Sequence, residues 1–216
     1  VRIGITIAIV LNLFYDYEGQ RQDLIRYMRE TENQLQILLC ELAAYLHNKD
    51  MEINVWDQII AFEGRMHEFI KAAYDYQDNT FHSHPGYYID YFEMRLAQLQ
   101  VLHNLHYEIK KIRKMPKQAL VIADYIMYMA DYVVEMNIPD QQIEKLEEIS
   151  EQMKQEELPK TREEFEGRAL LYHILMDLEE FLVYKKRFVN GLDEKKLRIY
   201  WKQEMEQKDS ANELQK

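Results

Sequence analysis

Apolar residues recur along this chain at alternating spacings of three and four, which is the period of an amphipathic helix. The pattern is clearest in the stretch Leu158–Phe188, which carries two neighbouring apolar stripes. The first stripe is a leucine seam and the second mixes small and large side chains: Leu171, Leu175, Leu178 and Leu182, then Ala169, Tyr172 and Met176. A helix with two apolar stripes is usually covered from two sides, so we expect this helix to be the central one.

The same periodicity predicts further helices before and after this stretch. The long ones are Gln20–Asn48, Asn54–Asp78, Tyr87–Lys114 and Lys117–Glu135. A narrow apolar stripe among many acids predicts a peripheral helix over Asp140–Glu157, and a short helix follows Gly191. With only 6 Gly and 4 Pro, the chain has few turns. We therefore predict an all-α fold, an antiparallel bundle of about four to five long helices with shorter peripheral helices. The short connection at Pro116 predicts that the helices on either side of it form an antiparallel hairpin.

The start of the central helix is marked by local signals. Thr161 can cap it, and Glu164, three residues later, completes a capping box by reaching back to the amide of the cap residue. Phe165 continues the stripe of Tyr172, so we expect its ring to enter the core. Arg168 precedes the leucine seam, where a charge is costly unless it is paired. We expect it to pair with a carboxylate of another helix, with Glu164 as the local alternative.

Cations end the same helix. Lys185, Lys186 and Arg187 precede Asn190 and Gly191, a typical stop signal. Positive charge is favourable at the carboxyl end of a helix, so we interpret the three cations as partners of the helix dipole.

The most apolar window lies at the N-terminus. Ile3–Phe14 would be roughly 18 Å long as a helix, too short for the roughly 30 Å hydrocarbon core of a bilayer. We interpret residues 1–15 as the end of a transmembrane helix, residues 16–208 as a helical bundle domain, and residues 209–216 as a charged tail. Arg21, Arg26 and Arg29 would then mark the cytoplasmic side. The alternative is that the window is a buried strand or helix of the core.

The net charge and the single cysteine disfavour a nucleic-acid partner and exclude an internal disulfide. The formal net charge is −11, which repels phosphate at long range and disfavours a nucleic-acid partner. Cys40 is the single cysteine and lies among leucines, so it cannot form an internal disulfide. It is best interpreted as a small buried hydrophobe in a reducing compartment.

Weak candidates for metal ligands lie on the central helix. Glu166, His173, Asp177 and Glu180 fall within about 60° of one another on a helical wheel. Carboxylate-bridged metal bundles repeat a Glu-x-x-His pair, which this chain lacks. A solvated stripe, or a core His173 held by Asp177, explains the residues as well. Nucleophile elbows and glycine-rich phosphate loops are also missing. We therefore predict no enzyme activity, no metal and no cofactor.

Three segments together resemble a known family. They are RIGITIAIVLNLF, DYFEMRLAQLQVL and LPKTREEFEGRALLYHILMDLEEFL. The chain resembles the C-terminal cytoplasmic domain of the bacterial aromatic acid exporter family, and its first 14 residues resemble the end of that family's last membrane helix. The resemblance implies an inner-membrane protein whose membrane part exports aromatic acids. It does not assign a transport pathway to this chain.

Two functions remain open at this point. The first is a non-catalytic cytoplasmic accessory or regulatory domain of a membrane exporter, acting in assembly, gating or partner binding. Its partners would be the membrane, through Ile3–Phe14, its own transmembrane domain and, as an open possibility, further copies of itself. The alternative is a helical bundle that binds an aromatic acid or a metal.

Overall fold

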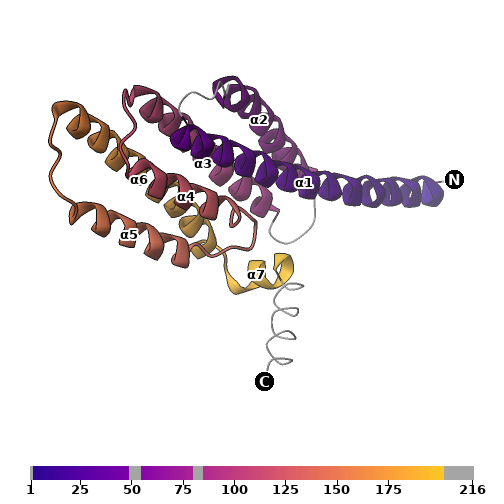
Figure 1. Cartoon of the computed structure of the whole chain (residues 1–216). Coiled ribbons are helices and arrows are strands. Elements are labelled where there is room, and N and C mark those ends of the chain that lie inside the picture. The colour runs from indigo at the N-terminus through magenta and orange to yellow at the C-terminus, as the bar shows by residue number, and fades with distance from the viewer. Residues whose placement is uncertain (1, 49–54, 80–84, 202–216) are drawn as a thin grey trace.

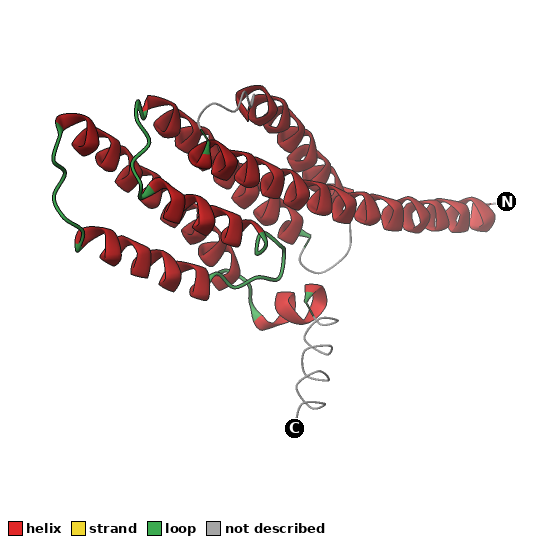
Figure 2. Cartoon of the chain, in the orientation of Figure 1, coloured by secondary structure: helices red, strands yellow, loops and turns green. Residues whose placement is uncertain are grey.

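The computed structural model of the chain describes residues 2–48, 55–79 and 85–201, with side chains from Gly19 onward except at 194, 195 and 198. These residues form helices, without a strand among them (Figures 1 and 2). The helices are α1 Arg2–His47, α2 Val55–Asn79, α3 Gly86–Lys111, α4 Ala119–Ala130, α5 Asp140–Lys154, α6 Arg162–Asn190 and α7 Glu194–Tyr200. The predicted all-α fold is confirmed. The charged tail expected at 209–216 and the side chains of Ile3–Phe14 lie outside the described residues.

One helix spans both the apolar N-terminal window and the first helix of the bundle. α1 contains 46 residues, a length of about 69 Å at 1.5 Å per residue. Its N-terminal part projects beyond the other helices in Figure 1. The sequence pattern placed the start of a helix near Gln20, whereas the structure continues the helix from Arg2 through that position.

The two helices predicted to form an antiparallel hairpin, α3 and α4, pack mainly against other helices. α3 packs mainly against α6 and α2, while α4 packs mainly against α1. The predicted hairpin between α3 and α4 is therefore wrong in its packing, although the two are joined by a short loop. α5 packs mainly against α6 and, to a smaller extent, against α4, so the expected peripheral position of this helix is confirmed.

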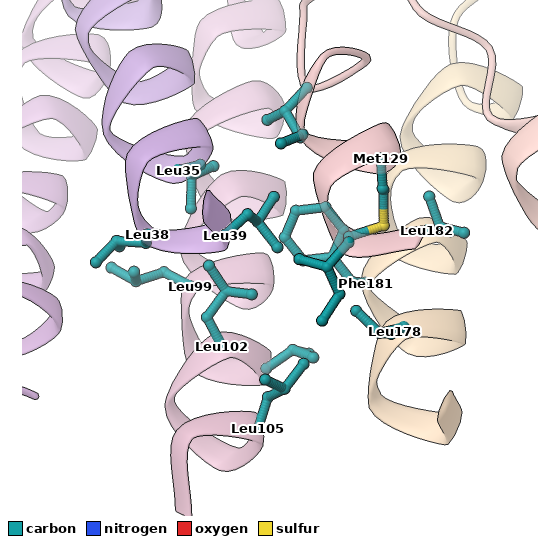
Figure 3. Packing of buried hydrophobic residues seen from close by; sticks show 14 of the residues in the cluster. Leu35, Leu38, Leu39, Leu99, Leu102, Leu105, Met129, Leu178, Phe181 and Leu182 are labelled. Carbon is teal, nitrogen blue, oxygen red and sulfur yellow. The ribbon is translucent and has the colours of Figure 1, made fainter. Parts of the chain in front are cut away.

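The core lies where α1, α3, α4 and α6 meet, as Figure 3 shows. Leucines of three helices fill it, together with one methionine and one aromatic ring: Leu35, Leu38, Leu39, Leu99, Leu102, Leu105, Leu178, Leu182, Met129 and Phe181. The predicted leucine seam of α6 is buried throughout, with Leu171 and Leu178 at 0% exposure. Central packing of α6 is thus confirmed for this seam.

α4 is shorter than its apolar pattern indicates. It ends at Ala130, where Tyr132 and Val133 donate backbone hydrogen bonds to carbonyls only three residues back. Such tight turns end a helix and let the chain change direction. The change of direction brings Glu135, expected at the end of this helix, into the interior of the bundle, where its side chain is 7% exposed.

Candidate functional site

The start of α6 folds as its sequence predicts. Thr161 has an extended backbone, and its hydroxyl accepts a hydrogen bond from the amide of Glu164 at 3.1 Å. The carboxylate of Glu164 accepts from the amide of Lys160 at 2.9 Å, one residue before the expected amide of Thr161. Both groups satisfy donors that a helix start leaves unpaired, so the cap is reciprocal as predicted but shifted by one residue.

The expectation that Phe165 enters the core is wrong. Its side chain is 61% exposed, and Met176 on the same stripe is 65% exposed. At 100° per residue, Phe165 lies about 160° around the helix from Gly167, which faces the bundle. The buried face follows Gly167 and the leucine seam, together with Ile174, Phe181, Lys185 and Phe188. On the second apolar stripe, Phe165 and Met176 are exposed, whereas Ala169 and Tyr172 are half-buried.

Arg168 is largely buried and makes mainly local contacts. Its guanidinium donates to the Glu164 carboxylate at 2.6 Å and to the carbonyl of Glu157 at 2.6 Å. The carboxylate of Glu156, in the α5–α6 connection, lies farther away at 3.9 Å. The expected partner from another helix is therefore not found among the described residues, and Glu164, the local alternative, is the ion-pair partner of Arg168. Nε of Arg168 is buried without a hydrogen-bond partner among the described residues.

A mostly apolar groove of about 230 Å³ lies beside this segment and is here called the signature groove. It is lined by Gln118, Met153, Lys154, Glu156, Glu157, Leu158, Pro159, Phe165, Arg168, Ala169 and Tyr172. Beside the groove, Gly167 allows a close approach of the chain, because a Cβ there would meet Cγ of Pro116 at 2.9 Å. The loop between α3 and α4 therefore closes directly onto α6. Leu158, at 86% exposure, stands at the rim.

The four weak metal candidates of α6 are not brought together. Glu166 pairs with Arg162 at 2.8 Å, and Glu180 accepts from the hydroxyl of Tyr184 at 3.0 Å. His173 is exposed. Burial, with Glu108 and Glu180 nearby, raises the pKa of Asp177 to about 6. Within the described part of the chain, groups of three or more metal-binding side chains do not occur.

The main polar feature of the interior is a set of ionisable residues drawn from α1, α3, the α4–α5 connection and α6. We call it the ionic cluster: Arg29, Glu32, Arg95, Glu135 and Lys185. Its members other than Arg29 are between 1% and 7% exposed. Charges are rarely buried unless they are paired, so the arrangement of the pairs decides what this cluster can do.

Arg29 joins the two carboxylates of the cluster. Its guanidinium donates to Glu32 at 2.8 Å and to Glu135 at 3.1 Å. Arg95 lies on the far side of Glu32, with 3.6 Å between Nη2 and the carboxylate. The pairs therefore tie α1 to α3 and to the α4–α5 connection in one network.

Tyrosine hydroxyls extend the network. Tyr87 donates to Glu135 at 2.6 Å and accepts from the indole of Trp201 at 3.2 Å. Tyr91 donates to Glu32 at 3.1 Å and accepts from Nε of Arg95 at 3.1 Å. Burial raises the pKa of both phenols, so they remain neutral donors.

Lys185 is the member most isolated from carboxylates. Its ammonium donates to the backbone carbonyl of Glu135 and lies 5.2 Å and 5.7 Å from the ring centres of Phe188 and Trp201. Burial, and then the charge of Arg95, lowers the pKa of Lys185 well below its ordinary value. The sequence interpretation of Lys185 as a partner of the helix dipole is wrong, because its side chain is 4% exposed inside the bundle.

Two members of the ionic cluster, Arg95 and Lys185, could have been predicted from the sequence. Arg95 lies four residues after Tyr91 and four before Leu99, within a buried stripe, and Lys185 continues the spacing of Leu178 and Leu182. A cation at a seam position indicates a buried charge. Glu135 carried no such signal, since its position depends on where α4 ends.

Comparisons with known proteins give a matching family and a similar curated protein. The family described as "Putative aromatic acid exporter C-terminal domain" matches residues 21–186. The "Uncharacterized protein YqjA" of Bacillus subtilis (strain 168) is 26% identical over 193 residues, which are 87% of this chain. The chain spans only 58% of the length of that relative.

A solved structure has the same fold. It is described as the "Crystal structure of putative membrane protein from Clostridium difficile 630", with a TM-score of 0.67 and 24% sequence identity. The match covers 76% of this chain and 98% of the other.

The similar solved structure is described as a putative membrane protein. Over the residues that were described, each helix is too short or too polar to cross a bilayer. The family match itself covers the bundle from α1 to most of α6, including the capped start of α6 and every member of the ionic cluster. This chain therefore belongs to the family of aromatic acid exporter C-terminal domains.

Proposed function

We propose that this chain is a non-catalytic accessory domain of an aromatic acid exporter, located on the cytoplasmic side of the membrane and acting in assembly, gating or partner binding. The observation that carries the proposal is the continuity of α1. The same helix contains the apolar Ile3–Phe14 window and, further on, Arg29 and Glu32 of the ionic cluster. A displacement at the membrane end of α1 would thus reach the interior of the bundle without crossing a flexible loop.

The ionic cluster is placed so that a displacement of α1 would change its ion pairs. Arg29 and Glu32 belong to α1, whereas their partners Tyr91, Arg95 and Glu135 belong to other segments. Breaking one partner from a buried ion pair costs several kcal/mol, about 3–5, so small shifts of α1 would be resisted and large ones would exchange partners. Networks of this kind have discrete arrangements, which is what a gating element requires.

Two arginines support the cytoplasmic side. Arg21 and Arg26 follow the apolar window closely, in the region where basic residues mark the cytoplasmic end of a membrane helix. Arg29, which the sequence offered as a third, is occupied by two carboxylates of the cluster. Its role in the fold explains Arg29 equally well. Arg26 also pairs, with Asp23 at 2.8 Å, but at the surface, so the assignment depends on the positions of Arg21 and Arg26 along the chain and not on their being unpaired.

The arrangement of ionisable groups supports a role without catalysis, metal or cofactor. The carboxylates of Glu32 and Glu135 accept hydrogen bonds from arginine and tyrosine side chains and are held inside the bundle. Burial raises the pKa of the Cys40 thiol, which works against a reactive thiolate. Elemental analysis of chelator-free protein tests the predicted absence of a bound metal, and stoichiometric zinc, iron or manganese would contradict it.

Vesicle flotation tests the membrane attachment. The full chain should float with vesicles of phosphatidylethanolamine and phosphatidylglycerol, and a chain without residues 1–16 should stay at the bottom while keeping its helical circular dichroism. A chain without residues 202–216 is the control and should float. If removing residues 1–16 melts the bundle cooperatively, the window belongs to the core and the proposal fails.

Hydrogen exchange tests the coupling through α1. Vesicle binding should change the protection of amides around Glu135 and Lys185, which lie far along the chain from the membrane window. Glu32→Gln should reduce that change, because it weakens the contact between α1 and Arg95. Protection that changes only in the first turns of α1 would argue against gating.

Protease digestion of inverted membrane vesicles tests on which side of the membrane the domain lies. These vesicles expose the cytoplasmic side, so a cytoplasmic domain would be cut.

The signature groove favours a second candidate, binding of an aromatic acid. The rings of Phe165 and Tyr172 line it, and Arg168 contributes an unpaired Nε–H. Calorimetric titration with benzoate should then give heat that Phe165→Ala and Arg168→Met abolish, while His173→Ala, on an exposed position of the same helix, leaves it unchanged. Equal or absent heat in all proteins would exclude this candidate.

A further inference from the structure

A small recess lies deep in the bundle, between α3, α6 and the α4–α5 connection. Its volume is about 10 Å³, enough for one water-sized particle. Arg95, Gln98, Asn137, Gln142 and Lys185 supply its polar lining, with apolar side chains around them. The two carboxylates of the ionic cluster, Glu32 and Glu135, do not contribute to this lining. The recess therefore has two cationic walls and no anionic one.

Both cations have hydrogen-bonding capacity that the described residues do not use. Arg95 is 1% exposed, and its Nε and Nη1 donate to Tyr91 and Gln98. Its Nη2 forms an ion pair with Glu32 at 3.6 Å, which is beyond hydrogen-bond distance, so its hydrogen-bonding capacity is not used by the described residues. Lys185 donates to a single carbonyl, whereas an ammonium group has three donors. A buried donor without an acceptor is costly, so the arrangement calls for an occupant that accepts from both.

We propose that this recess binds a small monovalent anion of the size of chloride, held by Nη2 of Arg95 and Nζ of Lys185. A water molecule would fit the volume, but it would leave the charge of protonated Lys185 uncompensated, since Arg95 already pairs with Glu32. An anion accepts from both donors and supplies the negative charge that the walls lack. Anything larger than one or two heavy atoms would require the recess to widen.

Charge balance links this anion to a proton. Arg29 and Arg95 balance Glu32 and Glu135, so the cluster is neutral when Lys185 carries no proton. When Lys185 is protonated, the cluster has one excess positive charge, and a bound anion restores neutrality. Anion and proton should therefore bind together, which the depressed pKa of Lys185 supports.

The experiment uses the full chain and measures urea unfolding at constant ionic strength while sodium chloride or bromide replaces sodium gluconate. An anion that binds only the folded state raises the unfolding midpoint with the logarithm of its concentration. Above the dissociation constant, each tenfold increase in halide should shift the unfolding equilibrium constant tenfold. Lys185→Met should remove this dependence. Lys186→Met, at the neighbouring position that pairs with Asp140 on the surface at 3.0 Å, is the matched control and should retain it.

The halide response should also weaken as pH rises through the titration of Lys185. The charged groups around this ammonium are Arg95 of α3, Glu32 of α1 and Glu135 of the α4–α5 connection, and they are unchanged in the Lys186→Met control. A halide response in Lys185→Met equal to that of the wild type, or a wild-type midpoint independent of halide, would overturn the proposal.

Crystals of the wild-type protein grown in bromide give a second test that does not depend on the folding of a variant. An anomalous peak within hydrogen-bond distance of Arg95 and Lys185 is expected. A recess that holds only a water molecule, with bromide peaks elsewhere, would also overturn the proposal. Neither test involves membrane binding, so its outcome is separate from that of the proposed accessory role.

Discussion

Replacing Tyr87 with phenylalanine should test the ionic cluster most directly. Tyr87 is 0% exposed, and its hydroxyl both donates to Glu135 at 2.6 Å and accepts from Trp201 at 3.2 Å. A hydrogen bond to a charged group contributes about 1.5–3 kcal/mol, and a buried N–H left unpaired costs about 1–3 kcal/mol. We expect Tyr87→Phe to lower the free energy of unfolding by about 3–4 kcal/mol at pH 7.

Urea denaturation measures this loss. For a typical slope of about 2 kcal/mol per molar urea, the midpoint should fall by about 1.5–2 M. Tyr74→Phe is the matched control, because Tyr74 also donates to a carboxylate, that of Glu93 at 3.1 Å, but at an exposed position. That exposed bond should contribute far less to the free energy of unfolding, because water can replace it. Equal losses in the two variants would refute the view that burial makes this network strong.

The pH dependence follows from Glu135. Burial raises its pKa, and the hydrogen bond from Tyr87 opposes that rise. A carboxyl group whose folded pKa is raised contributes stability that is full below the unfolded pKa and is lost as pH rises through the folded pKa. Tyr87→Phe should raise the pKa of Glu135 further. The penalty of the variant should therefore be larger at pH 7 than at pH 5, and a penalty that grows on acidification would contradict this assignment.

Three further variants test particular positions. Phe165→Ala should lower the free energy of unfolding by less than about 1 kcal/mol because the ring is 61% exposed, whereas Phe181→Ala, at 2% exposure, should cost about 3–5 kcal/mol in the same urea titration. Asp177→Asn should stabilise the protein at pH 7 by about 1 kcal/mol after allowing for solvent screening, since the pKa of about 6 means that ionised Asp177 is disfavoured in the fold. That gain should fade below the unfolded pKa near 3.8, and thermal melts at pH 7 and pH 3.5 would show whether it does. Gly167→Ala should cost about 1–3 kcal/mol, because its Cβ would meet Pro116 at 2.9 Å, and an unchanged midpoint would show that the α3–α4 loop can yield.

Much of this fold follows from local sequence rules. The period of the leucine seam identified the buried face of α6, and the Thr161 cap set its first turn. These features depend on residues within a few positions of one another, where helical geometry alone decides the contacts. The helix order along the chain and the peripheral place of α5 were predictable for the same reason.

The features that were missed depend on contacts distant in sequence. Phe165 was placed in the core because the second apolar stripe of α6 was assumed to meet another helix along its whole length, but the ring lines a groove that is open to solvent and is 61% exposed. The ionic cluster joins Arg29 to Glu135 across 106 positions, and no local pattern encodes that pair. For the signature groove, the sequence identified the segment but not its shape, which combines residues of α5, of α6 and of the α3–α4 loop that lie far apart in the chain.

Because α1 is continuous, its length fixes how the bundle is rotated relative to the N-terminal segment. Each residue added within a straight helix advances the two halves by 1.5 Å and rotates one against the other by about 100°. An ideal Cβ at Gly19 would have no heavy atom within 4 Å, so an insertion there would meet no steric obstacle. One added residue would turn the bundle to face a different direction relative to the N-terminal segment. Seven would restore the facing to within about 20° while moving the bundle about 10 Å farther along the axis. Relatives of this chain should therefore vary in length at this point by whole heptads, and rarely by one or two residues.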